Sequence, residues 1–276
     1  MDKALKKAVE EVCGAAESLK LDIVLVGALM AEFTPEMGSD YPRFRRTNDA
    51  DFGVYVRDWP TYQKFHEELM KRDFKPNPRI EHRLHLGTAM VDLIPYGREI
   101  APDGKITWPK SELEMSVLGF DEVCAAARKA ASEKELPVPV ITVSGFVLLK
   151  VIAYLERKAR NDAKRRDDAR DIEYWLHNYA GGIKDDRRFD LAGKPGLVHE
   201  DYETAGAALL GREVRALASS DAAAYVERLL KESEDPDSPF MDALAAGFLE
   251  ESADKKRAEG RALLAAFKKG FQSERP

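Results

Sequence analysis

The chain has 276 residues, 44% of them hydrophobic, and a formal net charge of -6. This is enough for one large or two modest globular domains, and no apolar run approaches the roughly 20 residues that a membrane span needs. The negative charge argues against indiscriminate coating of nucleic acid but permits a local basic groove. Because the first residues lead into an amphipathic helix and are not of the signal-peptide type, we expect a cytoplasmic protein without a membrane partner.

Two cysteines, Cys13 and Cys124, are too few for a disulfide framework or a zinc site. Both lie in alanine-rich helical patterns, where a buried thiol is the usual role. We expect both to be reduced and inert.

The first elements predict a corner that could bind phosphate. Residues 3–20 have the spacing of an amphipathic helix, and residues 21–26 form an aliphatic strand that ends at Gly27 and Ala28. A glycine there lets the backbone approach a ligand, and the N–H groups of a helix opening at 29–33 would face it. An ordinary strand-to-helix turn is the alternative.

Two carboxylates then stand two residues apart at the start of a β-forming run. In an extended strand Asp49 and Asp51 lie on one face. Like charges this close repel each other unless a positive group lies between them, and a divalent cation is the usual solution. The loop of residues 34–45 and Arg46, which follows it, place several arginines next to the pair.

A third aspartate lies in a predicted hairpin. Residues 79–86 and 89–95 flank the turn at Gly87-Thr88, and Asp92 lies in the middle of the second strand. A buried carboxylate is costly without a partner. Either Asp92 binds a cation or a base, or the strand lies at the sheet edge and the carboxylate is hydrated; a neighbouring strand with the acid pair favours the first alternative.

The remaining segments complete two predicted domains, an α/β domain over 1–143 and a helical domain over 144–276. Before the boundary we expect helices at 58–71 and 121–133, an ordered excursion around Trp108 at 96–120, and a strand at 138–143. Ser144 is a good N-cap for the long helical pattern that follows. Beyond residue 182 we expect alanine-rich helices at 202–210, 220–231, 240–250 and 254–269.

Lys150 is embedded in apolar residues of that long pattern, so its ammonium reaches either a pocket or anion, or bulk water. In one unbroken helix Lys150 and Asp168 would lie about 27 Å apart. They can share a site only if the chain turns back near Asn161-Asp162. The alternative is a single long helix whose charged residues form a solvated face.

Five segments together resemble the nucleotidyltransferase superfamily, and more closely the AbiEii/AbiGii-type toxin nucleotidyltransferases. The resemblance spans about residues 20–215. It rests on Val26-Gly27-Ala28 and on residues 46–52, 91–97, 148–153 and 168–172, in this order. It implies an α/β (α+β) fold with a mixed sheet flanked by helices, followed by a helical C-terminal domain.

The resemblance also implies roles for individual residues. Asp49 and Asp51 would bind Mg²⁺ or Mn²⁺, and Asp92 would complete the site or help to deprotonate the acceptor. The backbone of Gly27 and Ala28 would receive a nucleoside triphosphate. Ala28 departs from the serine or second glycine of many members, so this grip would rely on N–H groups.

Further cationic and polar residues are implied for the nucleotide itself. Lys150 would neutralise the triphosphate, and Arg46 and Thr47 would contact it. Asp168 would line the pocket, with Asp171 as the alternative.

Three functions remain open at this point. The first is transfer of a nucleoside monophosphate from a nucleoside triphosphate to tRNA or another macromolecule, with an antitoxin protein as partner. The second is a catalytically silent nucleotide-binding regulatory module, which is made plausible by Ala28 in place of a serine or second glycine. The third is a small-molecule, antibiotic-modifying nucleotidyltransferase, in which the excursion around Trp108 shapes the acceptor pocket.

Overall fold

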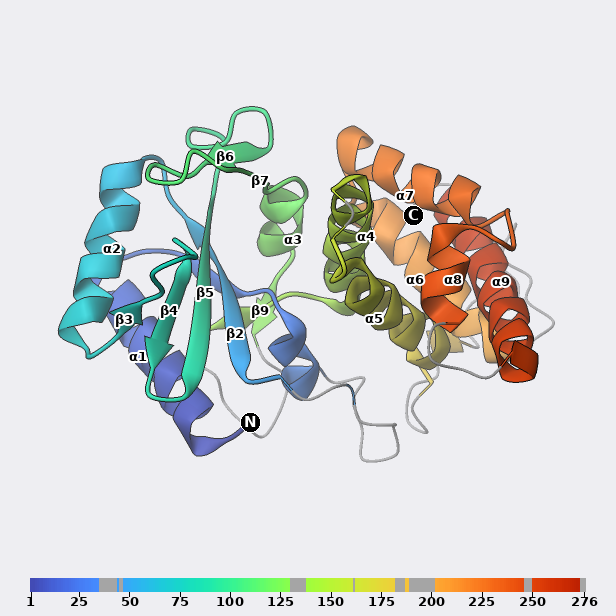
Figure 1. Ribbon diagram of the computed structural model, residues 1–276, viewed down its shortest axis with the longest axis horizontal. Coiled ribbons are helices and arrows are strands. Elements are labelled where there is room, and N and C mark those ends of the chain that lie inside the picture. The colour runs from blue at the N-terminus through green and yellow to red at the C-terminus, as the bar shows by residue number, and fades with distance from the viewer. Residues whose placement is uncertain are drawn as a thin grey trace. The chain divides into compact units, whose positions relative to one another are not determined.

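The computed structural model describes residues 1–34, 44, 47–129, 138–160, 162–181, 187–188, 202–245 and 250–273. Within them the chain divides into two compact units, one that ends at Thr142 and one that begins at Val143 (Figure 1). The domain ranges 1–143 and 144–276 stay a prediction, because compactness alone does not show that either part folds independently.

The first unit is built on a mixed sheet with the strand order β3-β4-β5-β2-β1-β9-β8. Its strands are β1 (Ile23–Leu25), β2 (Asp49–Tyr55), β3 (Lys75–Pro76), β4 (Arg83–Leu86), β5 (Ala89–Tyr96), β8 (Arg128–Lys129) and β9 (Pro139–Val140). Strands β2 and β5 are parallel neighbours, whereas β1 pairs with β2, and β4 with β5, in antiparallel fashion. The two long strands therefore form the centre of the sheet.

Alternation along β2 gives the sheet one apolar and one mixed face. Ala50, Phe52 and Val54 are fully buried, and they pair in register with Val91, Leu93 and Pro95 of β5. Helix α1 (Lys3–Leu19) lies against β2 and β5, and α2 (Trp59–Lys71) packs on α1. The period-2 pattern of the sequence thus separates a core face from the face that carries the acids.

Both of these helices begin at an aspartate cap. The carboxylates of Asp2 and Asp58 accept hydrogen bonds of 2.8 Å from the backbone N–H groups of Leu5 and Thr61. Such caps satisfy donors that the first helical turn leaves without partners. The predicted helices at 3–20 and 58–71 are confirmed.

The other predicted elements of this unit differ in detail. Helix α3 (Phe120–Ala125) ends earlier than predicted, and residues 130–137 lie outside the described part of the chain. Residues 28–33 form a 3-10 helix, η1 (Ala28–Phe33). The excursion contains an unpredicted two-stranded sheet, β6 (Lys105–Thr107) with β7 (Glu114–Ser116).

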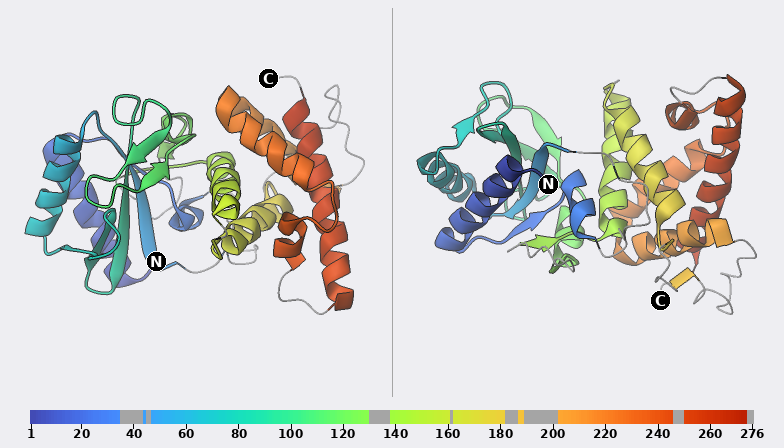
Figure 2. Two further views of the ribbon diagram at one scale, coloured as in Figure 1. Left: turned by 45° about the horizontal axis from the view of Figure 1, so that its top comes forward. Right: turned by 90° about the horizontal axis from the view of Figure 1, so that it is seen from below.

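The described residues of the second unit form helices and connecting turns and no strands (Figure 2). Its helices are α4 (Val143–Ala159), α5 (Arg165–Asn178), α6 (Tyr202–Leu217), α7 (Ser220–Glu232), α8 (Pro239–Ala245) and α9 (Glu250–Gln272). Helix α4 begins at Val143, so the prediction that Ser144 caps it was wrong: Ser144 lies inside the first turn and is buried.

Close approach of two backbones joins α6 to α9. A Cβ atom added to Gly211 would lie 2.1 Å from the carbonyl oxygen of Phe267, and one added to Gly270 would lie 1.8 Å from that of Ala208. Glycine at both positions lets the helices touch. The predicted fold class, a mixed α/β sheet flanked by helices and followed by a helical region, is confirmed. No helix in the described ranges is both long and apolar enough to cross a membrane.

Candidate active site

Asp49 and Asp51 open strand β2 and share the mixed face of the sheet. Both are half-buried, and Thr47 donates a hydrogen bond from its hydroxyl to Oδ1 of Asp49. In the structure Thr47 therefore orients a carboxylate. Arg46, the other predicted phosphate contact of this segment, lies outside the described residues.

The third aspartate lies directly beside this pair. Asp92 of β5 is the register partner of Asp51 in the parallel ladder, and it is 6% exposed. Register partners on neighbouring strands point to the same face, about 4.8 Å apart along the hydrogen-bonding direction. The structure therefore brings Asp49, Asp51 and Asp92 together on one face of one sheet. Their roles as ligands stay a prediction.

The backbone of Gly27 lies against the carboxylate of Asp51, which occupies the space that a side chain at position 27 would fill. Its backbone is extended, with φ -84° and ψ -168°, so no positive φ demands a glycine. A Cβ atom at this position would lie only 1.6 Å from Oδ2 of Asp51. The backbone of Val26 donates to the carbonyl of Asp51 over 2.8 Å, which fixes the approach. Ala28, the next residue, is buried and starts η1.

Arg83 is a residue of this face that the sequence analysis missed. It lies opposite Asp92 in the β4–β5 hairpin and donates from Nε to Oδ1 and from Nη2 to Oδ2, each over 2.7 Å. The hydrogen bonds to Asp92 outweigh burial and raise the pKa of Arg83, and the charges of Asp49 and Asp51 add to the rise. Of the two alternatives for Asp92, the pairing with a base is therefore the one observed.

The three carboxylates differ in how available they are to a magnesium ion. Within the described residues no three His, Cys, Asp or Glu side chains are arranged to hold a metal ion as they stand. Mg²⁺ at phosphate-transfer sites is commonly held by one or two carboxylates together with substrate phosphates. Asp49 and Asp51 fit that requirement, whereas both oxygens of Asp92 are engaged by Arg83.

Lys150 and Asp168 belong to the second unit, where they meet each other. The chain turns back between α4 and α5, as a shared site requires, and Nζ of Lys150 lies 3.0 Å from Oδ1 of Asp168 and 2.8 Å from Oδ2 of Asp171. Arg157 also donates to Asp168. Burial alone would lower the pKa of Lys150, but the two carboxylates outweigh it and raise that pKa. The ammonium thus reaches an anion, as one alternative predicted, and this anion is part of the chain itself.

Trp108 belongs to a buried aromatic cluster. Its side chain is 4% exposed and packs 5.5 Å from Trp59 and 5.3 Å from His82, measured between ring centroids. The excursion therefore anchors its tryptophan in the interior of the first unit.

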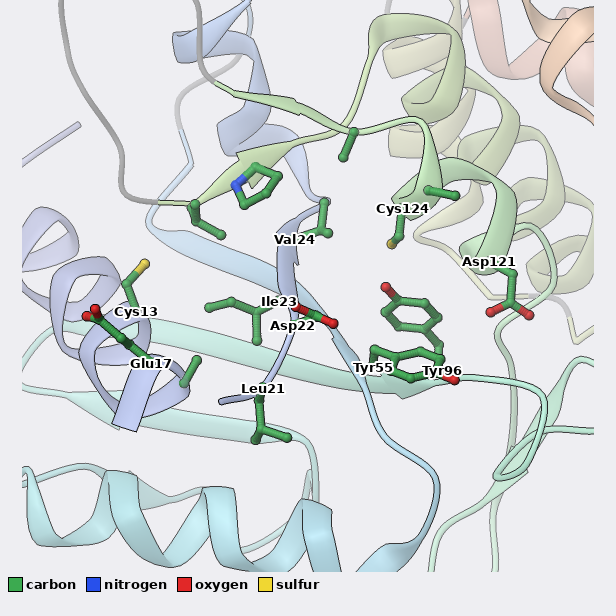
Figure 3. A pocket seen from close by; sticks show the side chains of 15 residues that line it. Cys13, Glu17, Leu21, Asp22, Ile23, Val24, Tyr55, Tyr96, Asp121 and Cys124 are labelled. Carbon is green, nitrogen blue, oxygen red and sulfur yellow. The ribbon is translucent and has the colours of Figure 1, made fainter. Parts of the chain in front are cut away.

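A cavity of about 800 Å³ lies at the other end of β2 and β5 (Figure 3). Tyr55 and Tyr96, which end these strands, contribute to its wall together with Asp22 and both cysteines. Because Tyr55 lies four residues along the strand from Asp51 and six from Asp49, about 13 and 20 Å, this cavity is separate from the acid pair. Both thiols are free and buried, and burial raises their pKa to about 12. The prediction of buried cysteines is confirmed, and the raised pKa disfavours the reactive thiolate.

The chain matches no protein-family model and no curated protein sequence. Solved structures similar to it include the antibiotic-resistance factor ANT(2'')-Ia in solution, at 12% identity and a TM-score of 0.36 over 63% of this chain and 82% of that one. The crystal structure of ANT(2")-Ia with adenylyl-2"-tobramycin follows at 10% identity and 0.34, over 61% and 85%. A tRNA-processing enzyme in its apo form gives 14% identity and 0.32, over 93% of this chain and 57% of that one.

Proposed function

We propose that this chain is a metal-dependent nucleotidyltransferase that moves a nucleoside monophosphate from a nucleoside triphosphate to an acceptor hydroxyl. The observation that carries the proposal is the row of Asp49, Asp51 and Asp92 on one sheet face, with the backbone of Gly27 against Asp51. Phosphoryl transfer needs positioning and charge neutralisation more than covalent help from the protein. A face of carboxylates beside the backbone of Gly27 suits that requirement.

Each residue of the face has a part in the proposed reaction. Asp49 and Asp51 would hold Mg²⁺ or Mn²⁺, which supplies charge neutralisation at the phosphates. Thr47 keeps Asp49 oriented by its hydrogen bond. Asp92 serves as the third carboxylate or takes up the proton of the acceptor hydroxyl, and the N–H groups at Gly27 and Ala28 bind phosphate oxygens.

The nucleotide requires further cationic groups, and the proposal assigns this role to Lys150 and to Arg46. Lys150 is already paired with Asp168 and Asp171, so binding a phosphate would draw its ammonium from one of these carboxylates. Asp168 would then line the nucleotide pocket.

The acceptor and the biological role rest on the five sequence segments that resemble the AbiEii/AbiGii-type toxins. On that basis the acceptor is tRNA or another macromolecule, the partner is an antitoxin protein, and the reaction takes place in the cytoplasm. A catalytically silent nucleotide-binding module is the second candidate. It is favoured by Ala28, which offers no hydroxyl, and by the engagement of Asp92 with Arg83.

The test is incubation of the purified protein with labelled nucleoside triphosphates, Mg²⁺ and total RNA. We expect label on RNA, and we expect Asp49→Asn and Asp51→Asn to lose at least about a hundredfold in rate, because each removes a charge that neutralises the metal. Asp58→Asn is the matched control. It makes the same chemical change at the exposed cap of α2, where asparagine caps equally well.

The outcomes separate the candidates. Nucleotide binding without transfer to RNA or to any small hydroxyl compound would support the silent module. Label on a small hydroxyl compound would shift the acceptor to the antibiotic class. Unfolding of both asparagine variants by circular dichroism, with Asp58→Asn intact, would make the acid pair structural.

A further inference from the structure

The cross-strand row continues beyond the acids. Strands β4, β5 and β2 are neighbours in that order (Figure 1), and their registers align Arg83 with Asp92 and Asp92 with Asp51. One fixed positive charge therefore stands in line with the carboxylates. The side chains of Arg83 and Asp92 are 18% and 8% exposed, so their pairing is largely shielded from water.

The geometry of this pair is that of a strong contact. Two parallel N–H···O bonds of 2.7 Å join the planar guanidinium to both carboxylate oxygens. Bidentate, charge-assisted pairs of this kind are stronger than single neutral hydrogen bonds, and an exposed ion pair loses more of its energy to solvent screening. Anything else that binds Asp92 has to work against this interaction.

A divalent cation is such a competitor. A carboxylate has about four lone-pair positions, so the arginine does not fill all of them. A metal ion on the remaining positions would nevertheless lie beside a guanidinium of the same sign of charge, in a place with little water to screen it. The same carboxylate cannot serve both cations at full strength.

We propose that Arg83 is a built-in counter-ion for the acidic row, and that a divalent cation has to displace it from Asp92 in order to use the third carboxylate. This inference rests on the proposed function, because it presumes a metal at Asp49 and Asp51. Arg83 is then a positioning residue: it holds Asp92 while the metal is absent and makes a three-carboxylate metal site conditional on its own release.

Binding of Mn²⁺ to the full-length protein without nucleotide, followed by electron paramagnetic resonance, tests this without any activity. Arg83→Gln removes the competitor, so the dissociation constant for Mn²⁺ falls by at least about tenfold. Arg83→Lys keeps the charge but cannot form the bidentate pair, so its dissociation constant for Mn²⁺ lies between those of the original protein and of Arg83→Gln. Arg79→Gln, an equal charge change at an exposed position of the same segment, leaves the constant within about twofold.

Asp92→Asn separates displacement from general electrostatics. If Arg83 acts through Asp92, then Arg83→Gln changes the Mn²⁺ constant by less than about twofold in the Asp92→Asn background, whereas a long-range charge effect persists there. An effect of equal size in both backgrounds overturns the inference. So does unchanged or weaker Mn²⁺ binding by Arg83→Gln, or a failure of both the original protein and this variant to bind Mn²⁺.

A second measurement needs no loss of the pair and so avoids any folding defect. In protein with ¹⁵N-labelled arginine, the Nε–H resonance of Arg83, assigned by its absence in Arg83→Lys, shifts and exchanges faster with water as Mg²⁺ is added. A resonance that stays unchanged at Mg²⁺ concentrations that saturate the site excludes displacement. Transfer of label to RNA is scored separately, so tighter Mn²⁺ binding in Arg83→Gln without any transfer would sustain this inference while the proposed function fails.

Discussion

The position of Gly27 shows how one missing side chain shapes the face of acids. The Oδ2 atom of Asp51 occupies the volume where a Cβ at position 27 would stand, although the backbone angles of Gly27 suit any residue. Glycine is therefore required at position 27 because a side chain has no room there, not because of the backbone angles. The backbone at Gly27 therefore lies against the Asp51 carboxylate with no room for a side chain between them.

This gives a prediction for Gly27→Ala. The methyl group has to push the Asp51 carboxylate away, so we expect transfer to fall by at least about tenfold, with a loss of about 1–3 kcal/mol in stability from the overpacked contact. Rate per folded molecule and urea unfolding measure the two effects. Gly87→Ala is the control: it strains a left-handed turn with φ +59° but has no atom within 4 Å, so it lowers stability alone. Equal rates in the two variants would contradict the prediction.

At the scale of elements, α2 is held to the centre of the sheet by a buried polar chain. The hydroxyl of Tyr62 donates to the carbonyl of Leu93 over 2.8 Å, and Nε2 of His66 lies 3.0 Å from the same hydroxyl. Because that proton is already donated, His66 has to be the donor in its own bond. Burial lowers the pKa of His66 to about 4, and the charges of Lys110 and His82 act in the same direction.

We therefore expect the stability of the first unit to depend on pH. The folded pKa of His66 lies below the unfolded value of about 6.5, so the unfolded chain binds more protons in between, and stability present above pH 6.5 is lost as the pH falls towards 4. The full loss is about 3 kcal/mol. Urea unfolding at about pH 7.5 and about pH 5 should show a smaller difference for His66→Gln than for the original protein. Parallel slopes for the two proteins would rule this histidine out.

The elements also show what the sequence could and could not predict. Periodicity correctly predicted α1, α2 and the β4–β5 hairpin, because amphipathic spacing and a turn glycine are local signals. The partner of Asp92 was predictable as well. Leu86 and Ala89 close the hairpin, and counting three residues outward from them pairs Arg83 with Asp92.

Other features had no local signal. The register that aligns Asp51 with Asp92 joins strands far apart in the sequence, and alternation specifies only the face of each strand, not its offset along the neighbour. Strands β6, β7 and β8 are two or three residues long, too short for any period to appear. The start of α4 was predicted wrongly, because Ser144 is a residue type that favours the N-cap but lies buried inside the first turn.

For the whole molecule, the division at residue 142 predicts that the two units unfold separately. Lys150→Met would leave Asp168 and Asp171 with less compensation in a buried site, so we expect the second unit to lose about 3 kcal/mol. Lys158→Met, which removes a more exposed pair with Glu232, should cost below about 1 kcal/mol.

The three tryptophans allow the two units to be followed apart, because Trp59 and Trp108 lie in the first and Trp175 in the second. In the Trp175→Phe protein, fluorescence reports on the first unit alone, and adding Lys150→Met should not shift that transition. In protein that retains Trp175, Lys150→Met should move the transition of the second unit to a lower urea concentration. A common shift of both transitions would mean that the chain unfolds as one cooperative whole.

The parallel pairing of β2 with β5 has a consequence for the order of folding. Antiparallel neighbours such as β4 and β5 can zip together from their turn, whereas parallel strands meet only after the intervening chain has crossed over. Asp51 and Asp92 therefore become neighbours late, once α2 and the hairpin are both in place. The hairpin has by then joined Asp92 to Arg83, so the charge of the third carboxylate is already compensated when Asp51 arrives beside it.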